Sequence, residues 1–237
     1  MNNRLKSFLI LLFSISTTAT FAQNNVSADR PGAGYGTFTV PTSTFYLESG
    51  ASISGDFSDV GQMFLRTGIT ENFEAQLGIG SLLFYENVDK PRVAVQSLAF
   101  KYGLGSFADE KLNLSLFSRT NLPFFNDDYE YYLTRFNLLA DYTINDTWGV
   151  NSNFGYGDFV DGLDNGSFNF NITPSFSVNE KTAGYFGYAV TFDKNFSSDL
   201  IEAGMVHFLN SSLQLDAGFI YADGDDLFLT FGIAKRF

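Results

Sequence analysis

Apolar and polar residues alternate one by one along most of this chain, in segment after segment of about ten residues. Phe168, Phe170 and Ile172, for example, alternate with Asn169 and Asn171. Successive side chains of a β-strand point to opposite faces, so a strand places the three apolar residues on one face and the two asparagines on the other. A helix would scatter the same residues around its circumference. The pattern therefore predicts strands that each have one apolar and one polar face.

Twelve segments follow this pattern between residue 43 and the C-terminus. We place them at 43–54, 61–70, 73–85, 93–104, 111–122, 130–143, 147–157, 167–178, 182–193, 200–209, 212–222 and 226–237. No long linker, charge block or low-complexity run interrupts the series, so we expect a single domain. An even number of strands brings both ends of a closed barrel to the same side, as in bacterial single-chain barrels.

Two architectures could use such strands. In a soluble sandwich the apolar faces of two sheets pack together, whereas in a membrane barrel the apolar face meets lipid and the polar face lines the lumen. Transmembrane strands need about nine to eleven residues, while strands of soluble proteins average about five or six. The segments here are long. We therefore predict an all-β fold, a transmembrane antiparallel up-and-down β-barrel of about 12 strands.

The first 22 residues have the features of a secretory signal peptide. Arg4 and Lys6 precede an apolar run at 8–15, and small residues follow at the spacing of a cleavage site. That run is too short to span a bilayer as a helix, and no later apolar stretch is long enough to do so. The expected organisation is a signal peptide at 1–22, an N-terminal periplasmic segment at 23–42 and an outer-membrane β-barrel at 43–237.

The connections between the predicted strands alternate between two classes. Short turns such as 145–146 and 179–180 alternate with longer acidic connections such as 158–166. Barrels keep their periplasmic turns short, so we place the longer connections at the cell exterior. Two acidic series in these loops could bind divalent cations or remain solvated, namely Asp158, Asp161 and Asp164, and Asp223, Asp225 and Asp226.

Composition excludes several functional classes. The net charge of −12 repels a phosphate backbone, so we expect no nucleic-acid partner. The absence of cysteine removes disulfides, thiol nucleophiles and thiolate metal sites. We expect no cofactor and no metal. The 28 Phe and 12 Tyr agree with the aromatic belts that a barrel places at the two membrane interfaces.

Charged and amide residues on the polar faces of the predicted strands are the candidate functional residues, because these faces line the lumen of a barrel. The candidates are Arg66, Glu74, Gln76, Lys101, Asn113, Arg119, Arg135, Asn137 and Asp141. The cations could form a constriction that sorts solutes by charge. They could instead pair with lumen acids and plug a narrow barrel. Twelve strands lie between the filled eight-stranded barrels and the open sixteen-stranded porins, so both alternatives stay open.

His207 is the only histidine of the chain. A barrel hydrolase would use it as the general base for a serine nucleophile. The sequence contains no Gly-x-Ser-x-Gly motif. We therefore expect no enzymatic activity, and we keep a hydrolase that uses His207 as an alternative.

The last predicted strand alternates apolar residues and ends at Phe237. A terminal aromatic residue on such a strand resembles the assembly signal of outer-membrane barrels, although Lys235 stands where an apolar residue is usual. This resemblance implies the barrel-assembly machinery as a partner.

Short motifs along the chain resemble the outer-membrane β-barrel transporter-like family named for the meta-pathway of phenol degradation (the MetA-pathway family). The matching pieces are residues 28–32, 39–41, 45–50, 68–74, 98–102 and 232–237, which together span essentially the whole mature chain. The resemblance implies a barrel transporter or channel. The family name implies small aromatic or other hydrophobic compounds as solutes.

These observations together predict a passive pore or transporter for small solutes in the bacterial outer membrane. Its expected partners are outer-membrane lipid and a small-molecule solute. A structural or adhesive barrel with an occluded lumen is the first alternative, and the hydrolase is the second.

Overall fold

The computed structural model describes residues 25–30, 32–86, 88, 90–122, 132–158, 166–193, 197–223 and 226–237. The predicted signal peptide at 1–22 lies outside these residues. Within them the strands are β1 (Phe45–Ile53), β2 (Phe57–Thr70), β3 (Phe73–Tyr85), β4 (Arg92–Val93), β5 (Gln96–Phe107), β6 (Leu112–Leu122), β7 (Thr134–Thr143), β8 (Trp148–Gly157), β9 (Ser167–Asn179), β10 (Thr182–Phe192), β11 (Ser197–Asn210), β12 (Leu213–Ala222) and β13 (Asp226–Arg236). In the same residues no helix is long and apolar enough to cross a membrane.

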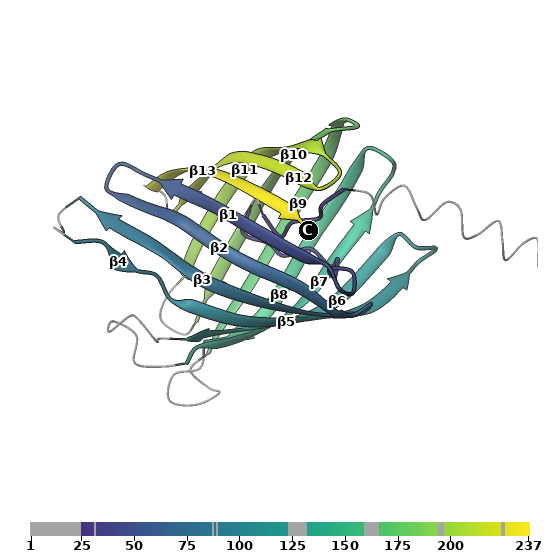
Figure 1. Ribbon diagram of the computed structural model, residues 1–237, viewed down its shortest axis with the longest axis horizontal. Helices are drawn as coiled ribbons and strands as arrows, with labels where there is room; N and C mark the ends of the chain where they lie inside the picture. The colour runs from purple at the N-terminus through teal and green to yellow at the C-terminus, as the bar shows by residue number, and fades with distance from the viewer. Residues whose placement is uncertain are drawn as a thin grey trace, which may run out of the picture.

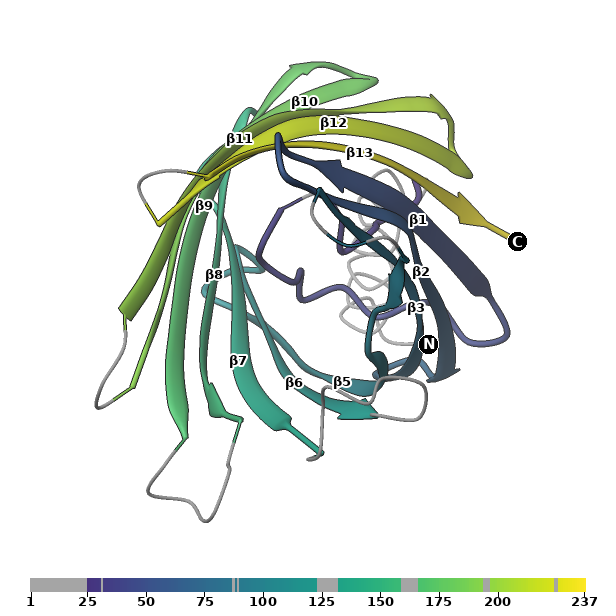
Figure 2. The same cartoon turned by 90° about the vertical axis from the view of Figure 1, so that its left-hand side faces the viewer.

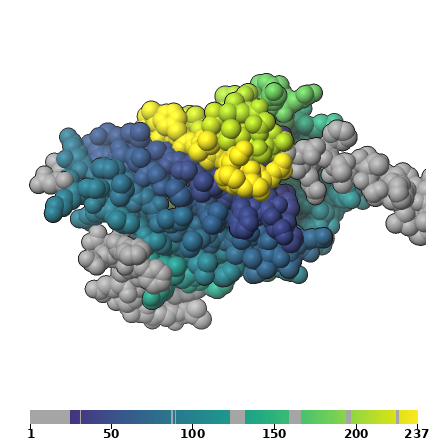
Figure 3. Space-filling model, viewed as in Figure 1, coloured from purple at the N-terminus to yellow at the C-terminus, as the bar shows by residue number. Residues whose placement is uncertain are grey.

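The strands form one closed antiparallel barrel (Figures 1 and 2). Each long strand pairs with its neighbours in sequence, and β1 also pairs with β13, from Tyr46 opposite Arg236 to Ile53 opposite Leu229. Figure 3 shows these first and last strands in contact on the outer surface. The backbone N–H of Phe237 donates to the carbonyl of Phe45 over 2.8 Å, so both ends of the barrel sequence lie on one side, as predicted.

All twelve predicted segments are strands of the barrel, and the predicted fold is confirmed. The difference is β4, a two-residue strand that pairs with β3 where the segment at 93–104 was expected to begin. Ala94 passes close to Gly80 of β3, whose φ of 95° favours glycine. A Cβ at Gly80 would lie 2.8 Å from the carbonyl oxygen of Ala94, so only glycine allows this close approach. The regular strand β5 therefore starts later, at Gln96.

The two faces of each strand follow the predicted alternation. On β9, Phe168, Phe170 and Ile172 are 39%, 36% and 39% exposed, whereas Asn171 between them is 4% exposed. The apolar residues point outward on the other long strands as well, for example Leu215 and Phe219 on β12. A closed wall with an apolar exterior and a polar interior is the arrangement that lipid requires of a β-sheet, because it leaves no unpaired edge in the membrane.

Ile172→Arg tests the assignment of the faces. Ile172 lies near the middle of β9 on its outward face, so the substitution places a charge in lipid and is expected to cost about 2–4 kcal/mol of unfolding free energy. The control is Thr173→Arg, because Thr173 points inward to a cavity that also contains Glu202. The control is expected to cost less than about 1 kcal/mol, since an inward arginine meets water and a carboxylate. Urea titration in lipid vesicles measures both values. A larger cost for Thr173→Arg would mean that the faces are reversed, and equal costs would contradict the assignment.

The N-terminal segment, here residues 25–30 and 32–40, lies inside the barrel (Figure 2). The expectation of a periplasmic segment at 23–42 therefore needs correction for these residues. The physical reason is that their backbone and charged groups have partners on the inward faces of the strands, as described below. Val26 and Val40 also pack with Tyr46 and Ala234 in a buried apolar cluster at the inner wall.

Candidate functional site

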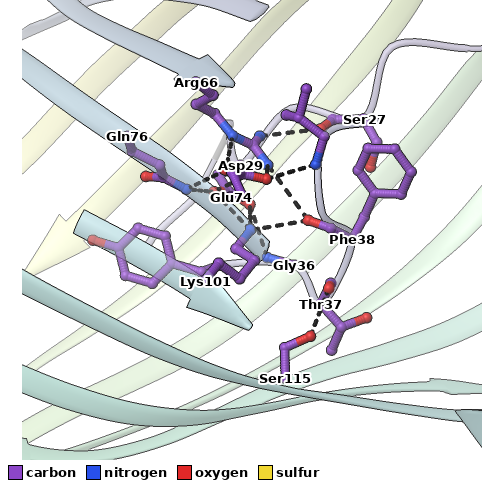
Figure 4. Close-up of polar contacts among 12 residues, drawn as sticks. Ser27, Asp29, Gly36, Thr37, Phe38, Arg66, Glu74, Gln76, Lys101 and Ser115 are labelled. Atoms are coloured by element: carbon purple, nitrogen blue, oxygen red, sulfur yellow. Dashed lines mark hydrogen bonds and ion pairs between the residues drawn. The ribbon is translucent and has the colours of Figure 1, made fainter. Parts of the chain in front are cut away.

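The centre of the lumen is a buried cluster of charges around Arg66 (Figure 4). The alternation of β1, β2 and β3 places Glu48, Arg66 and Glu74 on inward faces. The Arg66 guanidinium donates from Nε to Glu74 Oε1 over 2.7 Å and from Nη1 to Glu48 Oε1 over 2.6 Å. It also donates to the backbone carbonyl of Ser27 over 3.1 Å. The cluster therefore binds the N-terminal segment as well as neighbouring strands.

Asp29 of the N-terminal segment is the third carboxylate of this cluster. Lys101 Nζ lies 2.7 and 2.9 Å from its two oxygens and also donates to the Phe38 carbonyl over 3.2 Å. Burial raises the pKa of the Asp29 carboxyl, but the charges of Arg66 and Lys101, with hydrogen bonds from Lys101 and Gln76, outweigh it and hold the pKa below its usual value. Asp29 is therefore ionised at neutral pH and ties the segment to β2, β3 and β5.

A second anchor joins Thr37 to the opposite part of the wall. The backbone N–H and the hydroxyl of Thr37 both donate to Asp141 Oδ2, over 2.7 and 2.6 Å. Asn151 Nδ2 donates to the other oxygen of Asp141 over 2.7 Å, and Ser115 donates to the Thr37 carbonyl over 2.7 Å. Side chains of the wall thus provide the hydrogen-bond partners for the N–H and carbonyl of Thr37 that a neighbouring strand provides in a sheet.

Tyr35 is the third anchor. Its N–H donates to Asn153 Oδ1 over 2.6 Å, and its carbonyl accepts from Asn151 and Asn153. The ring stacks on Phe117 with centroids 4.3 Å apart, and the hydroxyl accepts a hydrogen bond from Arg119 Nη1 over 2.6 Å. Tyr35 therefore fixes the position of Arg119.

Further contacts hold the part of the segment before Tyr35. Arg30 donates to Gln62 Oε1 over 2.6 Å and lies 3.7 Å from Asp216, and the N–H of Ala33 donates to Glu202 Oε2 over 2.9 Å. Bonds from the segment thus reach strands on all sides of the lumen.

The predicted lumen residues divide into two groups. Arg66, Glu74, Gln76, Lys101 and Asp141 contact the N-terminal segment or the charge cluster directly, as described above. Arg119 joins this first group, because it donates to the hydroxyl of Tyr35 in the segment. The other three contact wall residues: Asn113 accepts from Ser106 over 2.6 Å, Asn137 accepts from Asn169 over 2.9 Å, and Arg135 pairs with Asp158.

The sequence analysis did not include several residues that complete this site. Glu48, Glu202 and Asp216 lie on inward positions of predicted strands, so the same alternation could have identified them. Asp29, Tyr35 and Thr37 carry no such signal, because the N-terminal segment has no period-two pattern.

Among the described residues, cavities of the lumen lie on both sides of the N-terminal segment, which lines three of them in part. Two lie toward the longer loops, with volumes of about 370 and 360 Å³, and share Ala33, Tyr35, Arg119 and Asn121. The third, of about 280 Å³, lies toward the short turns and is lined by Asp141, Tyr185 and Glu202 among others. The segment therefore separates an outer from an inner part of the lumen.

His207 and the acidic loops do not join this site. The His207 side chain is exposed on the outer wall, where Nδ1 lies 3.0 Å from the hydroxyl of Thr182. Within the described ranges, no three side chains of histidine, cysteine, aspartate or glutamate are grouped to hold a metal. Asp161, Asp164 and Asp225 of the two predicted acidic series lie outside those ranges.

Solved structures of outer-membrane barrels share this fold. An outer membrane channel from Pseudomonas putida F1 aligns with a TM-score of 0.67 and 11% identity, over 88% of this chain and 99% of that chain. The KdgM porin in complex with disordered oligogalacturonate aligns with a TM-score of 0.62 and 6% identity, over 81% and 99% of the two chains. The CymD monoaromatic hydrocarbon channel aligns with a TM-score of 0.51 and 7% identity, over 83% and 89%.

No family model and no curated protein sequence matches the chain. At these identities the structural likenesses show the fold, which is that of an outer-membrane β-barrel. The apolar outer wall and this fold together indicate the bacterial outer membrane as the location.

Proposed function

We propose that this protein is a passive pore or transporter for small solutes in the bacterial outer membrane. The observation that carries the proposal is the hollow, polar lumen within a closed wall, with cavities on both sides of the N-terminal segment. The fold is one that known porins and channels use. The predicted lumen residues then have two roles, because Arg66, Glu74, Gln76 and Lys101 position the segment, and Arg119 and Arg135 border the outer cavities.

Two finer assignments accompany this proposal. The sequence motifs support a relation to the MetA-pathway family, and small aromatic or other hydrophobic compounds are the corresponding solutes. The alternating last strand that ends at Phe237 supports recognition by the barrel-assembly machinery. An enzymatic role is not part of the proposal, since His207 lies on the outer wall beside Thr182.

The expected result in reconstituted membranes is discrete conductance steps in planar bilayers, together with swelling of proteoliposomes in small sugars, amino acids and aromatic acids. His207→Ala is the matched control and should conduct like the parent, because its side chain is outside the lumen. Lipid hydrolysis that this substitution abolishes would instead support the hydrolase.

An occluded structural barrel is the competing function. The many bonds between the N-terminal segment and the wall favour it over a wide pore. Parent protein that is folded in lipid but neither conducts ions nor passes solutes would overturn the proposed function and support this second candidate.

A further inference from the structure

In the part of the chain that the structure describes, Arg119 differs from the other lumen cations in having no carboxylate within ion-pair distance. Arg30, Arg66, Lys101 and Arg135 each lie within ion-pair distance of at least one carboxylate. Among the residues that the structure describes, none forms an ion pair with Arg119. Its neighbour across the β6–β7 ladder is Arg135, which turns to Asp158 instead. Arg119 therefore lines the outer cavities without a carboxylate in direct ion-pair contact among the described residues.

The surroundings of Arg119 leave Nη2 of its guanidinium without a hydrogen-bond partner among the described residues. Rings of Tyr35, Phe64 and Phe117 lie around it, with centroids 4.9, 5.0 and 5.6 Å from Cζ. Nη1 donates to the hydroxyl of Tyr35. Nε is buried, and neither Nε nor Nη2 makes a hydrogen bond to the described part of the chain. A carboxylate suits this position, because it can accept a charge-assisted hydrogen bond from Nη2 and balance the charge of the guanidinium.

Arg119 lies where a solute would pass. Arg119 lines both outer cavities, whose volumes of about 370 and 360 Å³ are within the range of small-molecule sites. Met63 and Phe64 give the first cavity an apolar wall, and Asn121 supplies a polar group. A ligand with a carboxylate and a ring-sized apolar body satisfies both the guanidinium and this wall.

We propose that Arg119 binds the carboxylate of a small single-ring organic acid at the junction of the two outer cavities, and thereby determines which solutes enter the lumen. This inference rests on the proposed function, since a solute must reach the lumen from the outer side. The rings around the guanidinium hold it in place before the ligand arrives, so little side-chain freedom is lost on binding.

Benzoate is the probe, and benzamide is its neutral counterpart of similar shape. Calorimetric titration of the full mature protein in detergent is expected to detect benzoate binding to the parent. Arg119→Gln should weaken it by about tenfold or more, because a charge-assisted hydrogen bond and its positive charge are lost. Benzamide binding should change little. Arg119→Lys keeps the charge without the planar guanidinium that the rings hold in place, and should give an intermediate affinity for benzoate.

Arg135→Gln is the matched control, because it removes the same charge from the neighbouring position while its guanidinium already pairs with Asp158. It should weaken benzoate binding by less than about threefold, as expected of a screened charge at a distance. Equal losses from both substitutions, unchanged affinity in Arg119→Gln, or no benzoate binding to the parent would each overturn the proposal. Heat-modifiable migration on gels verifies that each variant is folded.

The binding measurement does not depend on conduction. A parent that binds benzoate through Arg119 but passes no solute would overturn the proposed function while the carboxylate site stands. A parent that conducts but does not bind benzoate would overturn the site alone.

Discussion

Removal of residues 25–38 is expected to raise the single-channel conductance by roughly three- to tenfold, because it clears the lumen of a barrel intermediate in width between filled and open types. The wall should survive the deletion. It closes through main-chain pairing of β1 with β13, and the N-terminal segment contributes no strand to it. Lys101 loses Asp29 and the Phe38 carbonyl in this variant, but it then faces water and can be hydrated.

Two variants that keep the segment provide the control for this deletion. Asp29→Asn removes the charge that pairs with Lys101, and Thr37→Val removes the hydroxyl that donates to Asp141. Combined, they should leave the segment in place for part of the time, so that recordings switch between the parent level and the higher level. A deletion variant with the conductance of the parent would show that the N-terminal segment does not limit the pore.

The sequence predicted the wall of this protein well, for a physical reason. A strand between lipid and water must alternate apolar and polar side chains. Each of the twelve segments therefore shows in its own sequence that it is a strand and which of its faces points outward. Residues such as Phe170 and Asn171 therefore fell on the predicted sides. The lumen candidates followed from the same rule, since an inward position on a strand is fixed by its parity alone.

The destination of the N-terminal segment could not be predicted in this way. Its contacts join residues far apart in the chain, such as Asp29 with Lys101 and Thr37 with Asp141, which are 72 and 104 positions apart. The ion-pair partners of the inward-pointing charges could not be predicted for the same reason, because most of these partners lie far apart in the sequence. The alternation along the strands predicts that Arg119 and Arg135 both point inward. Only the folded structure shows that Arg135 pairs with Asp158, whereas Arg119 forms no ion pair within the described residues.

Arg66→Met is expected to destabilise the folded barrel by about 3–5 kcal/mol, because it removes one partner of a buried charge cluster and leaves its carboxylates uncompensated. Arg66 is fully buried, and Glu48, Glu74 and Asp29 lie 2.6, 2.7 and 3.6 Å from its guanidinium. Methionine keeps much of the volume, so loss of packing contributes little to the expected change. Urea titration in lipid vesicles gives the difference in unfolding free energy.

A double-mutant cycle separates the charge effect from a general intolerance of change in the lumen. Glu74→Gln in the Arg66→Met background removes one of the stranded carboxylates, so the double variant should be more stable than Arg66→Met alone, with a coupling energy of about 1–3 kcal/mol. Arg119→Gln is the control for loss of a lumen arginine, because it strands no carboxylate among the described residues. It loses the hydrogen bond to the Tyr35 hydroxyl and the ring contacts, which together are expected to cost about 1–2 kcal/mol. Equal destabilisation by Arg66→Met and Arg119→Gln, or purely additive effects at Arg66 and Glu74, would contradict the view that this ion-pair cluster holds the lumen together.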